Sequence, residues 1–329
     1  MGEKTGKPAK EMTGRNVSDS RRKDKEAGMT DIDMELYKVF YHVARTLSFS
    51  EASRALFISQ SAVSQSVKTL EKKLNCRLFA RSTKKVQLTP EGEILFRHIE
   101  PAINLIRQGE KKMLEAEGQG YGQLRIGASD TICRYFLVPY LEAFHKLYPR
   151  YSIKVTNQTS IECARMLDAG TVDLSLINYP NSALSGRHRL RTLKTFRDVF
   201  VANPDYFPLA GKCLSLQELL QYPILMLDGK STTGEFLHSR FRQANLELVP
   251  EIELSSNDLL IDLARIGLGI AFVPDFCIPA DGRDLFCLQL AEELPARHIA
   301  AAYNESVPVP EAALCFLKLL SKEKTERAE

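Results

Sequence analysis

Residues 48–92 read SFSEASRALFISQSAVSQSVKTLEKKLNCRLFARSTKKVQLTPEG, and this stretch decides the fold of the N-terminal part of the chain. Ser48 stands three residues before Glu51, which is the spacing of a capping box at the start of a short helix. Ser59 is placed to cap a further helix over residues 60–74. Two helices joined by a brief turn predict a helix-turn-helix, and an amphipathic pattern before Ser48 predicts one more helix in front of it.

The helix expected over residues 60–74 has two contrasting faces. Apolar side chains from Ala62 to Leu74 fall on one side at 3.6 residues per turn. The opposite side carries Gln, Ser and Lys, with no acidic residue in the first three turns. Gln can make two hydrogen bonds to adenine, and Lys can reach guanine or phosphate, so this face suits the major groove of DNA. The residues predicted to contact DNA from this helix are Ser59, Gln60, Ser61, Ser64, Gln65 and Lys68.

A loosely alternating segment rich in cations follows over residues 76–89. It predicts a two-stranded wing whose tip lies on the phosphates or in the minor groove. The cations expected to make these contacts are Arg81, Lys84 and Lys85.

Residues 48–92 closely resemble the winged helix-turn-helix of LysR-type transcriptional regulators. Ser61 stands where many members have Pro, and Gln65 stands where many have a cation, so the bases read are expected to differ. The matching elements are Ser48-Phe49 before Glu51-Ala52, Ser59-Gln60, Ala62-Val63-Ser64, Leu70-Glu71, Leu78-Phe79-x-Arg81 and Leu88-Thr89-x-x-Gly92.

The charge is divided unevenly along the chain. Residues 34–92 hold ten Lys and Arg against four Asp and Glu, whereas residues 121–329 hold 22 against 25. A basic head on a mildly acidic body is typical of a nucleic-acid binder with a second function. Residues 34–92 are therefore the expected DNA-binding domain.

The first 33 residues are charged and almost free of large apolar side chains. They predict a disordered tail, or the product of a start codon upstream of Met29 or Met34. This segment cannot be a secretory signal, and no apolar run reaches the roughly 18 residues of a membrane span. We expect a cytoplasmic protein that does not contact a membrane.

A helix is expected to begin at Pro90 and to end near Gly118, and residues 93–120 are expected to connect the two domains. The resemblance implies that it pairs with a second copy in a homodimer, which can assemble further into a homotetramer. The alternative is a helix that packs on its own domain, and Pro101 is expected to kink it. The apolar stripe expected at the dimer contact is Leu95, Ile99, Ala102 and Ile106.

Short apolar runs alternate with helical stretches over residues 121–329, which predicts an α/β domain with parallel-rich sheets. The expected elements include helices over residues 131–147, 160–168 and 258–266 and a strand over residues 172–176. Two such sets indicate two subdomains, one formed by residues 121–197 and 298–329 and the other by residues 198–297. The whole stretch resembles the LysR effector domain, whose architecture is that of periplasmic binding proteins. The best-matching segments are Leu124 to Ala128, Leu167-Asp168-x-Gly170-x-x-Asp173-Leu174 and Gly267-Leu268-Gly269-Ile270-Ala271.

Ligands of such a fold sit beyond the carboxyl ends of the strands, against the starts of helices. Hydroxyl side chains at three predicted helix starts favour a small anion such as a carboxylate, although Ser and Thr are common helix caps without any ligand. Resemblance to the family matches Thr131, Ile132 and Ser160 best to ligand-contacting positions. The full set of expected effector residues is Ser129, Thr131, Ile132, Thr159, Ser160, Ser231, Thr232 and Thr233.

Other classes of protein fit the sequence less well. Gly229-Lys230-Ser231 lacks the first glycine of a phosphate-binding loop, and the seven cysteines include no Cys-x-x-Cys pair, so neither an enzyme, a metal site nor a cofactor is expected. A redox switch between Cys277 and Cys287 is a weaker alternative to inert thiols. Two functional alternatives remain, a solute-binding sensor without a DNA role and an architectural DNA binder indifferent to ligands. The prediction is a sequence-specific LysR-type regulator whose partners are duplex DNA, a second copy, a small effector and RNA polymerase.

Overall fold

The computed structural model describes residues 32–81, 85–116, 122–278 and 284–326. The chain divides into two compact units, Met1–Ile103 and Asn104–Glu329. This division falls within helix α5, Pro90–Ala116, which continues through Pro101 as one helix. In the described segments no helix is long and apolar enough to cross a membrane. The domain limits expected at residues 33, 92 and 120 stay predictions.

The first unit confirms the expected winged helix-turn-helix. Its elements are α2 (Met34–Thr46), α3 (Phe49–Leu56), α4 (Gln60–Leu74), and the antiparallel strands β1 (Phe79–Arg81) and β2 (Val86–Leu88). Ser59 caps α4 as expected, with its hydroxyl accepting from the amide of Ala62. Ser48 accepts from the amide of Glu51 at 3.2 Å, but the return bond expected of a capping box is made by Thr46, whose hydroxyl accepts from the amide of Ser48.

The core of this unit forms where α2 and α4 present apolar faces to each other. Val63, Val67 and Leu70 of α4 are fully buried, whereas Ala62 is exposed, contrary to the expected pattern. Packing requires glycine at position 92 of the family motif, because a Cβ there would lie 2.1 Å from the carbonyl oxygen of Leu78.

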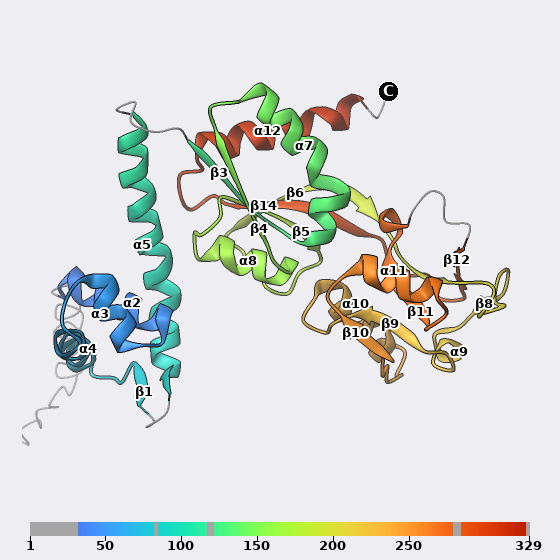
Figure 1. The fold of residues 1–329 in the computed structure, drawn as a ribbon, viewed down its shortest axis with the longest axis horizontal. Helices are drawn as coiled ribbons and strands as arrows, with labels where there is room; N and C mark the ends of the chain where they lie inside the picture. The colour runs from blue at the N-terminus through green and yellow to red at the C-terminus, as the bar shows by residue number, and fades with distance from the viewer. Residues whose placement is uncertain (1–31, 82–84, 117–121, 279–283, 327–329) are drawn as a thin grey trace, which may run out of the picture. The chain divides into compact units, whose positions relative to one another are not determined.

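The second unit contains two five-stranded sheets. The first has the order β4-β3-β5-β14-β6, with α7 and α12 packed on one face and α8 on the other (Figure 1). Strand β3 runs parallel to β4 and β5, while β14 is antiparallel to β5 and β6. The bounds are β3 (Gln123–Ala128), α6 (Asp130–Ile132), η1 (Cys133–Leu137), α7 (Val138–Leu147), β4 (Ser152–Asn157), α8 (Ser160–Asp168), β5 (Leu174–Tyr179), β6 (His188–Phe196), β14 (Arg297–Asn304) and α12 (Glu311–Glu326).

The second sheet has the order β10-β9-β11-β7-β12. Helices α9 and α10 cover one face and α11 covers the other. Both sheets are mixed, so the expectation of parallel-rich sheets is only partly met. The bounds are β7 (Asp198–Ala202), β8 (Cys213–Leu214), α9 (Leu216–Leu219), β9 (Ile224–Leu227), α10 (Thr232–Gln243), β10 (Ile252–Leu254), α11 (Asn257–Arg265), β11 (Ile270–Pro274), η2 (Asp275–Cys277), β12 (Phe286–Cys287) and β13 (Gln289–Leu290).

A buried ion pair lies where the chain passes between the sheets. Asp198 opens β7 and Arg297 opens β14, and the Nη1 of Arg297 lies 2.8 Å from the Oδ2 of Asp198. The guanidinium is 5.4 Å from the ring of Phe196 and 5.0 Å from that of Phe236. Burial raises the pKa of Asp198, and Arg297 opposes the shift. The ion pair therefore holds the start of β7 next to the start of β14, where the chain passes between the two sheets.

Besides the short strands β12, β8 and β13, the last two of which pair as a separate two-stranded sheet, two elements differ from expectation. The single helix expected from Thr131 to Leu147 contains the π turn η1, which ends two residues before Pro139, and Pro139 has no N–H to donate to the carbonyl four residues earlier. Strand β6 was not expected, because its exposed side chains include several cations and do not alternate with apolar ones.

Candidate functional site

Four helices of the second unit begin at one polar cleft between the two sheets. Each has a capping hydroxyl that accepts from the amide three residues later: Ser129 for α6, Thr159 for α8, Ser231 for α10 and Ser256 for α11. The strands before them, β3, β4, β9 and β10, form two parallel pairs whose carboxyl ends meet the cleft. Amides in the first turn of a helix lack partners within that helix, so their partial positive charges converge here.

The cleft holds a cavity of about 360 Å³. All the expected effector residues line it except Ile132, whose side chain is fully buried in the core of the first sheet. Ile132 is therefore corrected to a packing residue, since an apolar side chain directly after a helix start turns toward the sheet. The lining residues are Ser129, Asp130, Thr131, Asn157, Gln158, Thr159, Ser160, Asn178, Leu227, Asp228, Ser231, Thr232, Thr233, Ser255, Ser256 and Asn257.

Besides the four capping hydroxyls, three further hydroxyl groups of this cavity accept a hydrogen bond from the protein. Ser160 accepts from the amide of Asn178 at 3.1 Å, and Thr131 accepts from the Nδ2 of Asn257 at 2.8 Å. Thr233 accepts from the Nη1 of Arg297 at 3.1 Å, which places a guanidinium directly behind the cavity wall. Among the described contacts, their protons have no acceptor. These hydroxyls can therefore donate to a ligand.

The sequence-based prediction missed two asparagines. Asn178 and Asn257 are 6% and 3% exposed, and the Oδ1 of each has no hydrogen-bond partner among the described residues. Asn257 opens α11 after the cap Ser256, a signal that was present in the sequence as a hydroxyl before a predicted helix. Asn178 had no such signal, because it lies in an apolar strand that was expected to end at Leu176.

Polar contacts also bridge the cleft from one sheet to the other. The bond between Thr131 and Asn257 is one, and Tyr135 of η1 donates to Asp258 of α11 as a second. Burial and the carboxylate of Asp258 raise the pKa of Tyr135 to about 12, so its hydroxyl stays protonated at neutral pH. The two subdomains are thus joined by two side-chain hydrogen bonds across the cleft.

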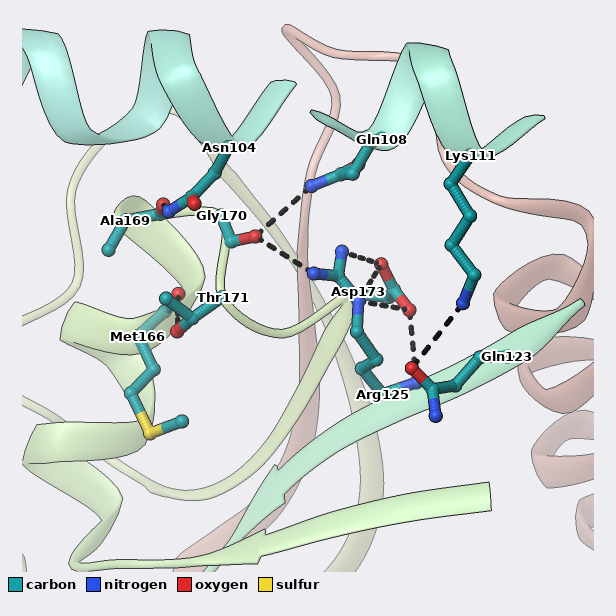
Figure 2. Close-up of polar contacts among 10 residues, drawn as sticks. All are labelled: Asn104, Gln108, Lys111, Gln123, Arg125, Met166, Ala169, Gly170, Thr171 and Asp173. Atoms are coloured by element: carbon teal, nitrogen blue, oxygen red, sulfur yellow. Dashed lines mark hydrogen bonds and ion pairs between the residues drawn. The ribbon is translucent and has the colours of Figure 1, made fainter. Parts of the chain in front are cut away.

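Helix α8 leads from this cleft to α5. Its first turn, at Ser160, lines the cavity, and its last turn ends at Ala169 and Gly170. There Asn104 of α5 donates to the carbonyl of Ala169 at 2.6 Å, and Gln108 donates to that of Gly170 at 3.1 Å (Figure 2). Two side chains of α5 therefore satisfy carbonyl groups at the end of α8 that the helix itself leaves open.

An ion pair lies beside this turn (Figure 2). Arg125 of β3 donates from Nη1 to the carbonyl of Gly170 at 3.2 Å and pairs with the carboxylate of Asp173. The Asp173 side chain is only 1% exposed. Gly170 and Asp173 belong to the motif that resembles the family, and the structure gives both a role at this junction.

A larger hollow of about 1080 Å³ adjoins the same junction. Several cations line it, among them Arg107, Lys111 and Arg150. Of its cations, Arg125 is committed to Asp173, and Lys111 donates to Gln123. The cleft is the stronger candidate because it contains buried polar groups without partners.

The expected DNA-contacting face is largely exposed. Gln60, Ser61, Gln65 and Lys68 of α4 are exposed, while Ser64 is half-buried. The Ser59 hydroxyl is committed to its cap and lies 2.9 Å from that of Ser61. In the wing, Lys85 is exposed, whereas the side chain of Arg81 and all of Lys84 lie outside the described residues.

The apolar stripe expected on α5 has a different distribution. Leu95 and Ile99 pack against the core of the first unit, because the first turns of α5 complete that core. Ala102 and Ile106 are exposed, and exposed apolar side chains continue on α5 at Ile94, Leu105, Met113 and Leu114. The dimer contact expected on α5 stays a prediction, and the exposed apolar set is the part of the helix that this chain itself leaves uncovered.

The cysteines give no sign of a redox pair. Burial raises the pKa of Cys133 to about 11 and that of Cys163 to about 12, and it also raises that of Cys277. A thiol with a raised pKa is protonated at neutral pH and reacts slowly.

Comparison with known proteins agrees with this geometry. The model of "Bacterial regulatory helix-turn-helix protein, lysR family" matches residues 34–93, and that of "LysR substrate binding domain" matches residues 117–324. The transcriptional activator CmpR of Synechocystis sp. is 27% identical over 296 residues, which cover 89% of this chain and 96% of CmpR.

Two solved structures share the fold at lower identity. A full-length OxyR variant from Pseudomonas aeruginosa is 20% identical, has a TM-score of 0.61, and is matched over 88% of this chain and 94% of its own. The CcmR regulatory domain of Synechocystis PCC6803, solved in complex with 2-PG, is 21% identical with a TM-score of 0.55, over 60% of this chain and 95% of its own. The chain belongs to the LysR family, as a transcriptional regulator with a helix-turn-helix DNA-binding domain and an effector-binding domain.

Proposed function

We propose that a small anion bound in the cleft controls how this regulator binds DNA. The observation that supports the proposal most is the convergence of four capped helix starts and two buried, unpartnered asparagine oxygens on one cavity of about 360 Å³. The CcmR domain, which shares the fold, has 2-PG in its structure, and this supports a ligand role for the corresponding domain here.

DNA contact is assigned to the exposed face of α4 and to the wing. Gln60, Gln65 and Lys68 read bases, and Ser61 and Ser64 adapt to them. Arg81, Lys84 and Lys85 hold phosphates or the minor groove. Ser59 keeps α4 in place through its cap.

The proposed route from the cleft to α5 is helix α8. Its nine residues span about 13 Å as a rigid unit. A ligand that contacts Ser160 moves or holds the first turn, and the far end carries Gly170 against Gln108 of α5. The ligand shifts DNA binding only by its difference in affinity for the two positions of α8.

Assembly and location complete the proposal. Two copies pair through the exposed apolar side chains of α5, centred on Leu105 and Ile106, and the pairs associate into a tetramer. The protein acts in the cytoplasm, where it meets DNA and RNA polymerase. No catalytic step is assigned to it, and its relatives are named as transcriptional regulators.

The alternative of a solute-binding sensor without a DNA role is disfavoured by the basic, acid-free face at the start of α4. The alternative of a ligand-independent DNA binder is disfavoured by the unpartnered polar groups of the cleft, which a purely structural domain would avoid.

Thermal unfolding of the full chain with a panel of small carboxylates, inorganic phosphate and sulfate tests the effector site. A ligand at 100 times its Kd stabilises its domain by about 2.7 kcal/mol. Thr131→Val should abolish the shift if the anion sits in the cleft. A shift that persists in Thr131→Val but disappears in Arg150→Ala would place the anion in the larger hollow instead.

A further inference from the structure

The cleft offers hydrogen-bond acceptors as well as donors. Asn178 and Asn257 line the cavity and are nine-tenths or more buried, and the Oδ1 of each is buried without a partner among the described residues. A buried acceptor without a donor is unfavourable, and native structures avoid it. A ligand that only accepts hydrogen bonds, such as a simple carboxylate, would leave both oxygens unsatisfied.

The pairing of Thr131 with Asn257 makes this conclusion independent of how the amide is oriented. With Nδ2 donating to Thr131, the cavity receives the hydroxyl proton of Thr131 and the Oδ1 of Asn257. With the amide turned over, Thr131 would donate to Oδ1, and the cavity would receive an N–H of Asn257 and a lone pair of Thr131. In both cases the pair presents one donor and one acceptor to the ligand.

The charged groups around the cavity limit the negative charge of the anion that it can bind. No Lys or Arg is among its described lining residues, and two carboxylates, Asp130 and Asp228, are. Asp130 accepts from Asn157, and Asp228 accepts from the amide of Lys230. The positive character comes from helix starts and from Arg297 behind Thr233, and Asp198 already neutralises Arg297. Such a site suits one negative charge better than two.

We propose that the effector is a small hydroxylated monocarboxylate: its carboxylate accepts from Thr131, Ser160, Thr233 and the helix starts, and its hydroxyl groups donate to Asn178 and Asn257. This inference rests on the proposed effector site. The cavity volume of about 360 Å³ is at the small end of ligand pockets, which agrees with a ligand of few carbons.

The test compares matched pairs of acids on the full chain by calorimetry and thermal unfolding. The pairs are glycolate with acetate, lactate with propionate, and glycerate with propionate, with inorganic phosphate as the dianion. The hydroxylated member of at least one pair should bind about 5- to 100-fold more tightly than its mate, because only it supplies a donor to the buried oxygens.

Substitutions of the two asparagines test whether these side chains cause the preference for hydroxylated acids. In Asn178→Leu and Asn257→Leu the ratio of the two affinities should fall toward one, whereas a purely structural role would weaken both members of a pair equally. Asn257→Asp keeps the shape of the side chain and should weaken every acid through charge, which serves as a folded control if a Leu variant does not fold.

The outcomes separate this inference from the proposed site. If acids without a hydroxyl, or phosphate, bind as tightly as the hydroxy acids and lose binding in Thr131→Val, the effector site stands and the ligand class is wrong. If no member of the panel shifts the unfolding temperature, both are wrong.

Discussion

The Nε2 of Gln108 lies 3.1 Å from the carbonyl oxygen of Gly170, and this bond joins α5 to the end of α8. Gly170 has a φ of +68°, and a Cβ added there would lie 3.5 Å from the Cβ of Asn104. The left-handed backbone therefore favours glycine at this turn, and a Cβ there would be in ordinary van der Waals contact with α5.

Gly170→Asn should separate the two helices, because Asn tolerates the left-handed backbone while its amide group extends into the space of Asn104 and Gln108. Hydrogen exchange of amides 104–116 should rise. Gly211→Asn is the matched control, since Gly211 has a φ of +77° and open space around it. Equal exchange in the two variants would show that the contact does not hold α5.

Gln65→Ala should cost about 1–3 kcal/mol on a duplex selected from random sequences and little on unselected DNA, because it removes a contact to a base. Lys85→Ala should weaken both duplexes alike and reduce the salt dependence of binding. Mobility-shift titrations at several salt concentrations measure both effects. Unchanged binding of the selected duplex by Gln65→Ala would mean that α4 does not read bases with this face.

Ile106→Asp should dissociate the proposed dimer, because it would place an unpaired charge in the proposed apolar contact at a cost of several kcal/mol. Ile99→Asp should instead lower the unfolding temperature of the N-terminal unit, since Ile99 packs on its core. Sedimentation and thermal unfolding separate the two effects. Intact dimers in Ile106→Asp would place the interface elsewhere.

Maleimide labelling at neutral pH should modify the exposed Cys213 and Cys287 before the buried Cys163 and Cys277. Burial raises the pKa of Cys163 to about 12, so the native state holds its thiol proton and labelling becomes fast only as the pH rises toward that value or the domain unfolds. Mass spectrometry of timed samples identifies the order. Early labelling of Cys277 would instead support the alternative of a redox switch between Cys277 and Cys287.

Much of the fold could be predicted from the sequence because local signals agreed with each other. Hydroxyl caps and apolar periodicity placed α4 and α8 at their observed bounds, Gln60–Leu74 and Ser160–Asp168. Strand β6 could not be predicted in this way, since its stability comes from pairing with β14 and not from its own pattern.

The candidate site could be predicted only in part, because local signals reveal some of its residues and not others. Caps such as Thr159 and Ser231 are visible before each predicted helix, but the roles of Asn178 and Asn257 depend on pairings between distant segments. Periodicity shows that a face of α5 is apolar and not which neighbour covers it. Leu95 and Ile99 pack against the core of the first unit, and their contact with a second copy stays a prediction.

The proposal that the cleft controls DNA binding through α8 is tested most directly by removing the contact between α8 and α5. The quantity measured is the change in DNA affinity that a ligand of the cleft causes. The ligand is the hydroxy acid with the largest thermal shift, and the variant is Asn104→Ala with Gln108→Ala. In the parent chain this acid should change the affinity for a selected duplex by about 5- to 150-fold. In the double variant the acid should bind with an unchanged Kd and leave the DNA affinity unaltered. An undiminished response of DNA binding in the double variant would contradict the account.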